Sequence, residues 1–315
     1  MEFPLVSFVI PMYNAEKTIY LCLKSITELN YPKDRFEIIV VDNNSTDNSP
    51  AIARSSIATL YNKKNGTIAA VRNFGAKHAR GDILAFVDSD CMILENWVTA
   101  ALEQLKLPEN GATGNRYSAP PESTWVERAW LYDSNGAPYE TDFIPGGNFI
   151  IKAAIFKQLG GFNETLITCE DVDICHRVKQ CGLKVINCPA MKNIHFGNHK
   201  TLKQFFLKEI WYGTNMMQKY STNKVSNVFF VTSIFTILHT AFFVSIMTCN
   251  LIGNCFINII TPVTGLFFIV AVSAAYRVKK SKKYRLLPHI FILCYVYFLA
   301  RSISLIKNIR LRGCA

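Results

Sequence analysis

Residues 1–209 alternate short apolar runs, rich in β-branched and aromatic residues, with segments whose apolar positions have helical spacing. Apolar runs without a polar face are typical of strands buried on both sides of a mostly parallel sheet. Strands are predicted over residues 6–10, 37–41, 58–61, 82–87, 112–119, 143–151 and 183–188. Helices are predicted over residues 50–56, 68–79, 94–107, 125–132, 153–159 and 171–181, and over a segment containing Ile19, Leu23 and Ile26. This alternation predicts an α/β fold with helices on both sides of the sheet.

Two local signals refine the first part of this pattern. Pro11 follows the first predicted strand and is expected to close it, because proline has no N–H to donate to a strand ladder. Asn14 precedes the first helical segment and is expected to cap it through its side chain.

The last third of the chain has much longer apolar stretches. Residues 225–276 contain no Asp, Glu, Lys or Arg. A membrane-spanning helix needs about 20 apolar residues, so this stretch predicts spans at about 227–249 and 256–276, with a turn within 250–258. A third apolar segment, about 286–306, fits an interfacial helix as well as a span. The alternative to membrane spans is a buried helical hairpin of a soluble protein.

The basic charge belongs to this C-terminal part. The chain has a formal net charge of +11, yet residues 1–209 hold all 23 acidic residues and 22 of the 34 basic ones. Basic residues flank the predicted spans at Lys219, at Lys224 and within 277–285. By the positive-inside rule, both flanks lie in the cytoplasm. The sequence predicts an integral membrane protein with a cytoplasmic domain at 1–191, a basic connector at 192–224 and a membrane region at 225–312.

The remaining composition excludes other classes of protein. Basic residues flank the spans and form no basic face on the soluble part, so nucleic-acid binding is disfavoured. The N-terminus has no basic segment of a secretory signal. The ten cysteines include no C-x-x-C pair and no zinc spacing, which indicates free thiols in a reducing compartment. A small transporter or channel is disfavoured, because the predicted spans contain no Asp, Glu, Lys or Arg before Arg301.

Polar residues cluster where predicted strands end, at residues 11–14, 42–47 and 88–90. Ligands of open parallel sheets bind outside the carboxyl ends of the strands. Carboxylates there suit hydrogen bonds to a nucleoside or coordination of a divalent cation. The chain has no glycine-rich phosphate loop, so a bound nucleotide would need a metal and an arginine to neutralise its phosphates.

Each candidate residue also has a purely structural explanation. Asp42 fits an Asx turn, and Asp88 with Asp90 fits a solvated turn. Arg72 fits a surface or ion-paired arginine. Glu170 and Asp171 fit carboxylates in the first turn of a helix, while Asp171 and Asp173 form a second D-x-D pattern and thus a rival metal site.

Taken in order, the motifs resemble those of glycosyltransferase family 2. They are VIPMYN at 9–14, VVDNNSTD at 40–47, NGTIAAVRNFG at 65–75, DSD at 88–90, GGN at 146–148, GGFNE at 160–164 and EDVD at 170–173. Val71 stands where the family usually has alanine. The chain has KEIWY at 208–212 in place of Q-x-x-R-W, which argues against a processive polymerase.

The resemblance implies a GT-A fold, Mg²⁺ or Mn²⁺ as cofactor, and inverting transfer from a nucleotide-diphospho-sugar. It also implies a role for each matching residue. Pro11, Tyr13 and Asp42 would hold the base and ribose, and Arg72 would face the base or the diphosphate. Asp88 would contact ribose or sugar and, with Asp90, the metal. Asp171 would be the general base, assisted by Glu170. His195 is a further metal or phosphate contact, or else an ordinary hydrogen-bonded loop histidine.

The sequence therefore predicts a glycosyltransferase that acts on a lipid-linked or surface-glycan acceptor at the cytoplasmic membrane face. Its expected partners are the nucleotide-sugar donor, this acceptor and membrane lipids, and no nucleic acid. One alternative is a polyprenyl-phosphate glycosyl synthase, whose acceptor is a phosphate and needs no strong base. The other is a membrane scaffold that keeps the fold without catalysis.

Overall fold

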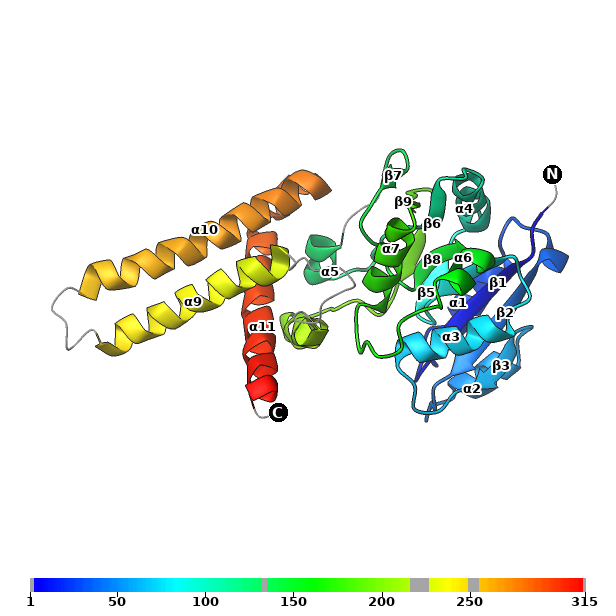
Figure 1. The fold of residues 1–315 in the computed structure, drawn as a ribbon, viewed down its shortest axis with the longest axis horizontal. Coiled ribbons are helices and arrows are strands. Elements are labelled where there is room, and N and C mark those ends of the chain that lie inside the picture. Colours follow the sequence, from blue (N-terminus) through cyan, green and yellow to red (C-terminus); the bar gives the residue numbers. More distant parts are fainter. Residues whose placement is uncertain (1–2, 132–134, 216–226, 249–254, 314–315) are drawn as a thin grey trace. The chain divides into compact units, whose positions relative to one another are not determined.

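The computed structural model describes residues 3–131, 135–215, 227–248 and 255–313 of the chain. It has two compact units (Figure 1). Unit 1 contains Met1–Pro121 and Tyr132–Asn198, and unit 2 contains Glu122–Leu131 and His199–Ala315.

Unit 1 is built on an eight-stranded sheet with the order β3-β2-β1-β4-β8-β6-β9-β7. The strands are β1 (Val6–Met12), β2 (Phe36–Asp42), β3 (Thr59–Asn62), β4 (Ile83–Val87), β6 (Asn110–Gly114), β7 (Tyr139–Glu140), β8 (Asn148–Lys152) and β9 (Lys184–Asn187). Strands β3, β2, β1 and β4 run parallel, as do β6 and β9. Strand β8 runs antiparallel to β4 and β6, and β7 to β9. A small second sheet pairs β5 (Cys91–Ile93) with β10 (Asn193–His195). The predicted mixed, mostly parallel sheet is confirmed.

Helices cover both faces of this sheet. They are α1 (Ile19–Thr27), α2 (Ser49–Arg54), α3 (Ile68–His78), α4 (Trp97–Leu105), α6 (Ala153–Gln158) and α7 (Glu170–Gln180), with a 3-10 turn, η1 (Lys33–Arg35). Phe8 and Ile10 of β1 pack with α1 and α4, whereas Val9 between them packs with α3, α6 and α7. Burial on both faces explains why these strands are continuously apolar in the sequence.

The two expectations for the first strand and helix are wrong. Strand β1 continues through Pro11 to Met12. Its pairing with β4 ends at Val9, so the missing N–H falls where the ladder on that side has ended. Helix α1 has Thr18 as N-cap, without a side-chain hydrogen bond. Asn14 instead adopts φ 48°, and its Oδ1 accepts a hydrogen bond from the Thr46 N–H at 2.8 Å. Asn14 thus ties the loop after β1 to the loop after β2.

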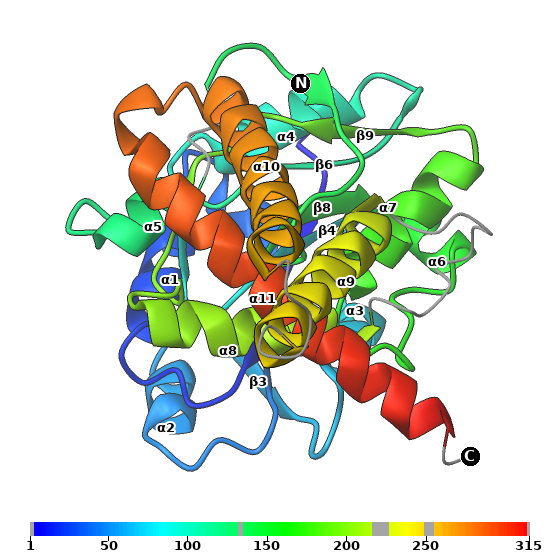
Figure 2. The same ribbon diagram turned by 90° about the vertical axis from the view of Figure 1, so that its left-hand side faces the viewer.

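Unit 2 is helical. Its elements are α5 (Trp125–Trp130), α8 (Leu202–Tyr212), η2 (Gly213–Asn215), α9 (Asn227–Thr248), α10 (Cys255–Ser281), η3 (Tyr284–Leu286) and α11 (Leu287–Gly313). Helices α9 and α10 lie side by side, and α11 crosses them (Figures 1 and 2). Helix α5 belongs here because Arg277 lies over the Trp130 ring at 3.6 Å and donates to the Trp130 carbonyl at 2.6 Å.

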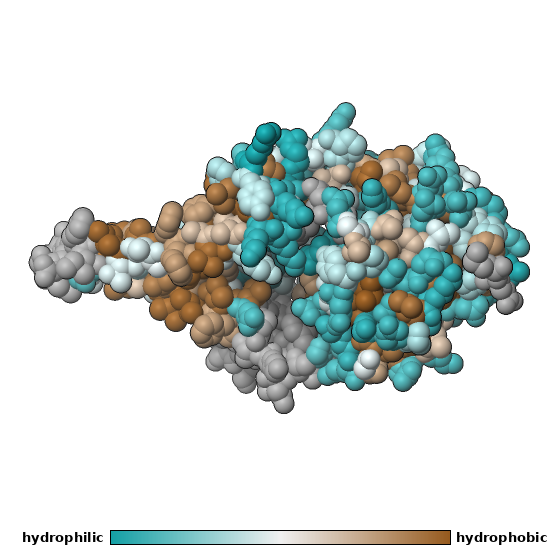
Figure 3. Space-filling view, turned by 90° about the horizontal axis from the view of Figure 1, so that it is seen from above, coloured by the Kyte–Doolittle hydropathy of each residue, from teal (hydrophilic) through white to brown (hydrophobic). Residues whose placement is uncertain are grey.

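Three helical segments of unit 2 are long and apolar enough to cross a membrane: Asn227–Thr248, Asn258–Ser281 and Tyr284–Lys307. Hydrophobic residues gather on the surface of α9 and α10 (Figure 3). Within the third segment, the half-buried Arg301 donates to Glu209 of α8 at 2.7 Å, which explains how an apolar helix accommodates a charge. Lys219, Lys224 and most of the predicted turn lie outside the described residues.

Candidate functional site

The predicted site residues lie at the carboxyl ends of three neighbouring parallel strands. Strand β2 ends at Asp42, which is in register with Met12 at the end of β1. Tyr13 follows β1, and Asp88 follows β4 on its other side. This edge is where an open parallel sheet binds ligands.

Asp42 and Tyr13 differ in exposure. Asp42 is 4% exposed, and its carboxylate accepts the Ser45 N–H at 3.2 and 3.3 Å, three residues on, one residue further than in an Asx turn. Tyr13 is 61% exposed. Asn43 and Gly66 exchange two hydrogen bonds of 3.1 and 3.2 Å, which joins the loop after β2 to the start of α3. An exposed aromatic ring therefore lies beside a fixed polar turn.

Arg72 links two of the predicted carboxylates. Thr67 caps α3 by accepting the Ala70 N–H, and one turn later Arg72 is 3% exposed. Its Nη1 contacts Glu170 Oε1 at 2.5 Å, and its Nη2 contacts Asp88 Oδ1 at 2.6 Å. The two acidic side chains raise the pKa of Arg72 despite its burial. Of the two structural explanations for Arg72, a surface arginine and an ion-paired one, the structure shows the ion-paired one. Its contact with Glu170 joins two residues that are 98 positions apart in the chain.

Two glycines before β8 make this close approach possible. A Cβ on Gly146 would lie 2.7 Å from Arg72 Nη1, and one on Gly147 would lie 2.0 Å from Asp88 Oδ2. The Asp88 N–H donates to the Gly147 carbonyl at 3.3 Å. Any side chain at either position would displace the charged groups, so this Gly-Gly pair belongs to the site.

Asp171 lies beside the charged cluster but has no cation of its own. Its Oδ2 accepts the Gly146 N–H at 3.2 Å, and its Oδ1 accepts the Val172 N–H at 2.8 Å. Burial and, next, the negative charge of Glu170 raise the pKa of Asp171 to about 7. A carboxylate with a pKa near neutrality suits general-base work.

The rival D-x-D pattern does not form a shared site. Asp173 forms an ion pair with Arg177 at 2.7 Å, whereas Asp171 accepts two backbone N–H groups. Among the residues that the structure describes, the group of three possible metal ligands is Asp90, Cys91 and His195. The structure therefore favours the first D-x-D motif as the metal site.

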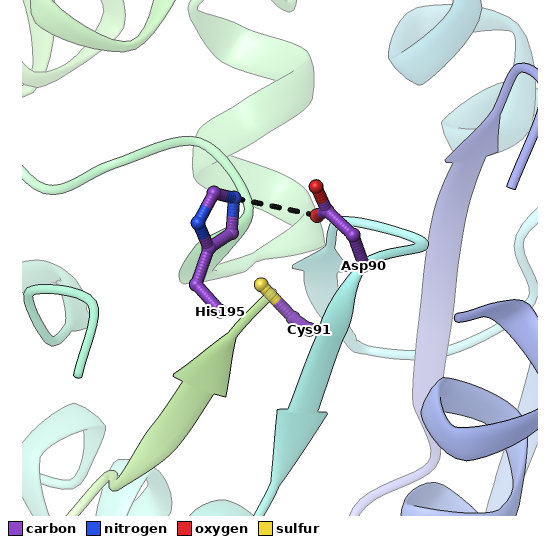
Figure 4. Close-up of side chains that lie close together, drawn as sticks. All are labelled: Asp90, Cys91 and His195. Carbon is purple, nitrogen blue, oxygen red and sulfur yellow. Dashed lines mark ion pairs between the residues drawn. The ribbon is translucent and has the colours of Figure 1, made fainter. Parts of the chain in front are cut away.

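Asp90 and His195 meet across the small second sheet (Figure 4). His195 pairs with Cys91 in the β5–β10 ladder, and its Nε2 lies 3.3 Å from Asp90 Oδ1. Its Nδ1 bonds Asn198 Oδ1 at 2.7 Å, which orients the ring. Burial alone would lower the pKa of His195, but the hydrogen bond to Asp90 and its charge raise it.

The donors around Asp90 fit a divalent cation. Carboxylate oxygens suit Mg²⁺ and Mn²⁺, and neutral imidazole is a common metal ligand. A Cβ on Gly197 would lie 1.9 Å from Asp90 Oδ2, so glycine leaves this carboxylate the space that it occupies. The buried thiol of Cys91 also points toward this space (Figure 4), a neighbour that the sequence reasoning missed.

Two more residues of the site were missed. Tyr117 Oη donates to Asp88 Oδ2 at 2.9 Å, and burial and, next, the charge of Asp88 raise the pKa of Tyr117 well above its usual value. Asn73 holds Phe162 by hydrogen bonds to its N–H and carbonyl, both 2.8 Å. Asn73 lies within the motif at 65–75, but the sequence does not reveal its contact with Phe162. Tyr117 lies in no motif, so only the fold reveals it.

Comparison with known proteins identifies the family. The sequence model of "Glycosyl transferase family 2" matches residues 7–162, and that of "N-terminal domain of galactosyltransferase" matches residues 130–202. The chain belongs to glycosyltransferase family 2. The matched ranges contain the strand-end residues, Arg72, the Gly-Gly pair, Glu170, Asp171 and His195 of this family 2 chain.

Individual relatives of this family 2 chain match over shorter parts. Glycosyltransferase AglE of Haloferax volcanii is 30% identical over 195 residues, which are 57% of this chain and 62% of that protein. Poly(ribitol-phosphate) beta-glucosyltransferase of Bacillus spizizenii is 39% identical over 97 residues, 27% of this chain and 14% of that protein. The chain thus covers less than two thirds of the length of these curated relatives.

A solved structure matches nearly the whole chain. It is the mannosyltransferase PcManGT from Pyrobaculum calidifontis in complex with GDP-Man and Mn²⁺, with a TM-score of 0.64 and 20% identity. The match covers 98% of this family 2 chain and 88% of that protein. The likeness confirms the predicted GT-A fold.

Proposed function

We propose that this chain is a metal-dependent, inverting glycosyltransferase that moves a sugar from a nucleotide-diphospho-sugar to an acceptor hydroxyl. The observation that carries the proposal is the buried Asp88–Arg72–Glu170 cluster with Asp171 beside it. It holds a carboxylate for the donor and a carboxylate with a pKa of about 7 in one site. Membership of family 2 and the GDP-Man complex of the structural neighbour support the donor class.

The donor half of the site lies at the strand ends. We assign Pro11, Tyr13 and Asp42 to the base and ribose, with the exposed Tyr13 ring available for stacking. Asp88 faces ribose or sugar and is oriented by Arg72. Arg72 also supplies positive charge near the diphosphate, which the absence of a glycine-rich phosphate loop makes necessary.

Asp90 and His195, with Asp88, would hold Mg²⁺ or Mn²⁺. When bound, the cation neutralises the charge that grows on the leaving diphosphate. Asp90 is assigned as the primary ligand because its carboxylate faces Nε2 of His195, the other assigned ligand. The Asn198 bond at His195 Nδ1 leaves Nε2 directed toward Asp90.

Asp171 acts on the acceptor. Its carboxylate takes the proton of the incoming hydroxyl as the oxygen attacks the anomeric carbon, and the bond to the diphosphate breaks on the opposite face. A single displacement of this kind inverts the anomeric centre. Glu170 assists through its negative charge, which raises the pKa of Asp171 and so makes it a stronger base near neutral pH.

The acceptor is proposed to be lipid-linked or part of a surface glycan. The three segments able to cross a membrane follow unit 1 directly in the chain, so they would keep it at the bilayer. The six basic residues within 277–285 support a cytoplasmic position for the flank of α10 and, on the same side of the membrane, for unit 1. The name of one matched relative, poly(ribitol-phosphate) beta-glucosyltransferase, contains a polymer and supports a polymeric acceptor.

The test is nucleotide release and nucleotide binding by the full chain in detergent. UDP-, GDP- and dTDP-sugars are offered with Mn²⁺, with Mg²⁺ or with EDTA, and membrane lipid extract serves as acceptor source. We expect release from one donor class that EDTA and Asp90→Ala abolish, while Asp34→Ala, an exposed aspartate of η1, retains it.

The outcomes separate the alternatives. Metal-dependent binding of a nucleoside diphosphate without any turnover would overturn catalysis and favour the scaffold. Absence of metal-dependent binding of UDP, GDP and dTDP would overturn the proposal altogether.

A further inference from the structure

Tyr117 contacts both halves of the proposed site. Its hydroxyl donates to Asp88 Oδ2 at 2.9 Å and accepts the Gly147 N–H at 3.1 Å. Its ring stacks on the imidazole of His195, with centroids 4.2 Å apart and planes inclined by 14°. One partly buried side chain thus joins the aspartate assigned to the donor to the histidine assigned to the cation.

The backbone around Tyr117 fixes this arrangement. The His195 N–H donates to the Ser118 carbonyl at 3.1 Å, and Ser118 forms an isolated bridge with Ile194. Two residues before Tyr117, Asn115 Nδ2 donates to the carbonyl of Met191, which lies four residues before His195, at 3.3 Å. The segments that carry Tyr117 and His195 are therefore held side by side, so a shift of one ring moves the other.

The Asp88 carboxylate is oriented from two sides. Arg72 binds Oδ1 at 2.6 Å, and Tyr117 binds Oδ2. With Arg72 alone, the carboxylate has a single fixed oxygen and can rotate around that contact. The phenol therefore determines which way the second oxygen faces, and it also occupies one face of the His195 ring.

We propose that Tyr117 is a positioning residue of the transferase reaction, which sets Asp88 and His195 in the mutual arrangement that the donor and the cation require. The inference rests on the proposed function. It assigns Tyr117 two separable contributions: the hydroxyl orients Asp88 for the donor, and the ring orients His195 for the cation.

Two substitutions separate these contributions. Tyr117→Phe removes the hydroxyl and keeps the ring, whereas Tyr117→Leu removes both. Tyr31→Phe is the matched control, because the Tyr31 hydroxyl also bonds within unit 1, to the Pro4 carbonyl at 2.5 Å, but away from the site. For each variant we would measure the donor KM and kcat by nucleotide release, the Kd of Mn²⁺ alone by electron paramagnetic resonance, and the Tm.

A hydrogen bond to a charged group implies an effect of about tenfold or more. We expect Tyr117→Phe to raise the donor KM about tenfold with kcat changed less, and to leave the Mn²⁺ Kd within about twofold. Tyr117→Leu is expected to raise the Mn²⁺ Kd as well, about tenfold. Tyr31→Phe is expected to change neither constant.

An unchanged donor KM in Tyr117→Phe would overturn the proposed role of the hydroxyl. An unchanged Mn²⁺ Kd in Tyr117→Leu would overturn the proposed role of the ring. Parallel changes in KM, kcat and Tm, shared by Tyr31→Phe, would reduce Tyr117 to a structural residue. If Tyr117→Leu does not fold, Tyr117→Phe still decides the first point. Wild-type chain that releases no nucleotide would refute the proposed function, whereas the Mn²⁺ measurement would still test the ring.

Discussion

Each unit of the molecule contains an arginine in an ion pair, but the two are balanced differently. In unit 2, Arg301 contacts one carboxylate, that of Glu209, at 2.7 Å. In unit 1, Arg72 contacts two, those of Asp88 and Glu170, and Asp171 lies beside them as a third. The pair in unit 2 is neutral, whereas the cluster in unit 1 has more acids than bases.

This difference separates an ion pair that joins two helices from a charged cluster at the proposed reaction site. Arg301 joins α11 to α8 through Glu209, whose carboxylate is also near the positive charge of Arg277. In unit 1, burial and, next, the negative charge of Glu170 raise the pKa of Asp171 to about 7. Perturbed carboxylates of this kind are typical of functional sites. Excess charge, rather than burial alone, therefore distinguishes the site from the helix contact.

The largest effect is expected for Asp171→Asn, which removes the general base and keeps the shape of the side chain. General-base catalysis contributes about 10²- to 10⁴-fold, so kcat of nucleotide release should fall by that factor with little change in the donor KM. Asp173→Asn is the control, because Asp173 pairs with Arg177. Substantial remaining activity in Asp171→Asn would favour the polyprenyl-phosphate alternative, whose phosphate acceptor needs no base.

The second prediction concerns Arg72, the cation of the acidic cluster in unit 1. Arg72→Leu leaves Asp88 and Glu170 without their partner, and such a break costs about 3–5 kcal/mol of unfolding free energy. We expect a lower Tm of unit 1 and loss of nucleotide release. Arg72→Leu combined with Glu170→Gln should recover part of the Tm, since one buried charge is gone. Equal Tm values for the single and double variants would contradict the charge argument.

The third prediction concerns the ion pair between Arg301 and Glu209 in unit 2. Glu209→Gln leaves Arg301 without its counter-charge, and a hydrogen bond to a charged group contributes about 1.5–3 kcal/mol. We expect lower thermal stability in detergent, whereas replacement of both residues by leucine should restore it. The kcat of nucleotide release per folded molecule should stay unchanged. A drop in kcat equal to that of Arg72→Leu would erase the distinction between the two arginines.

The sheet was predictable from the sequence because its strands are buried on both faces. Residues such as Phe8, Val9 and Ile10 face opposite helix layers, so local composition alone reveals the strand. The ends of elements were harder to predict. Pro11 stayed inside β1 because the neighbouring ladder had already ended, a fact about β4 that the local sequence does not contain.

The site was predictable where chemistry and order along the chain coincide, as for Asp88, Arg72 and Asp171. It was not predictable where a contact depends on segments far apart. Tyr117 reaches Asp88 across 29 positions, and Asn73 reaches Phe162 across 89. Neither contact leaves a local pattern, because each is made by two segments that only the folded sheet brings together.

The smallest effect is a pH dependence with a clear direction. With a pKa of about 7, Asp171 becomes protonated as the pH falls below neutrality, so kcat should drop by about tenfold per pH unit. Asp171→Asn should lose this acid limb. Stability should change in the opposite sense. The folded pKa lies above the usual 3.8, so the stabilisation is complete below pH 3.8 and is lost as the pH rises through about 7.

Wild type should therefore lose Tm relative to Asp171→Asn over the pH interval in which its rate increases. This opposition follows from the burial of Asp171 and the charge of Glu170 beside it, because the same two effects that make Asp171 a stronger base also destabilise its charged form in the fold. A pH-rate profile and a series of melting curves for both proteins would measure it. Rate and stability rising together with pH would show that the acid limb belongs to a different group.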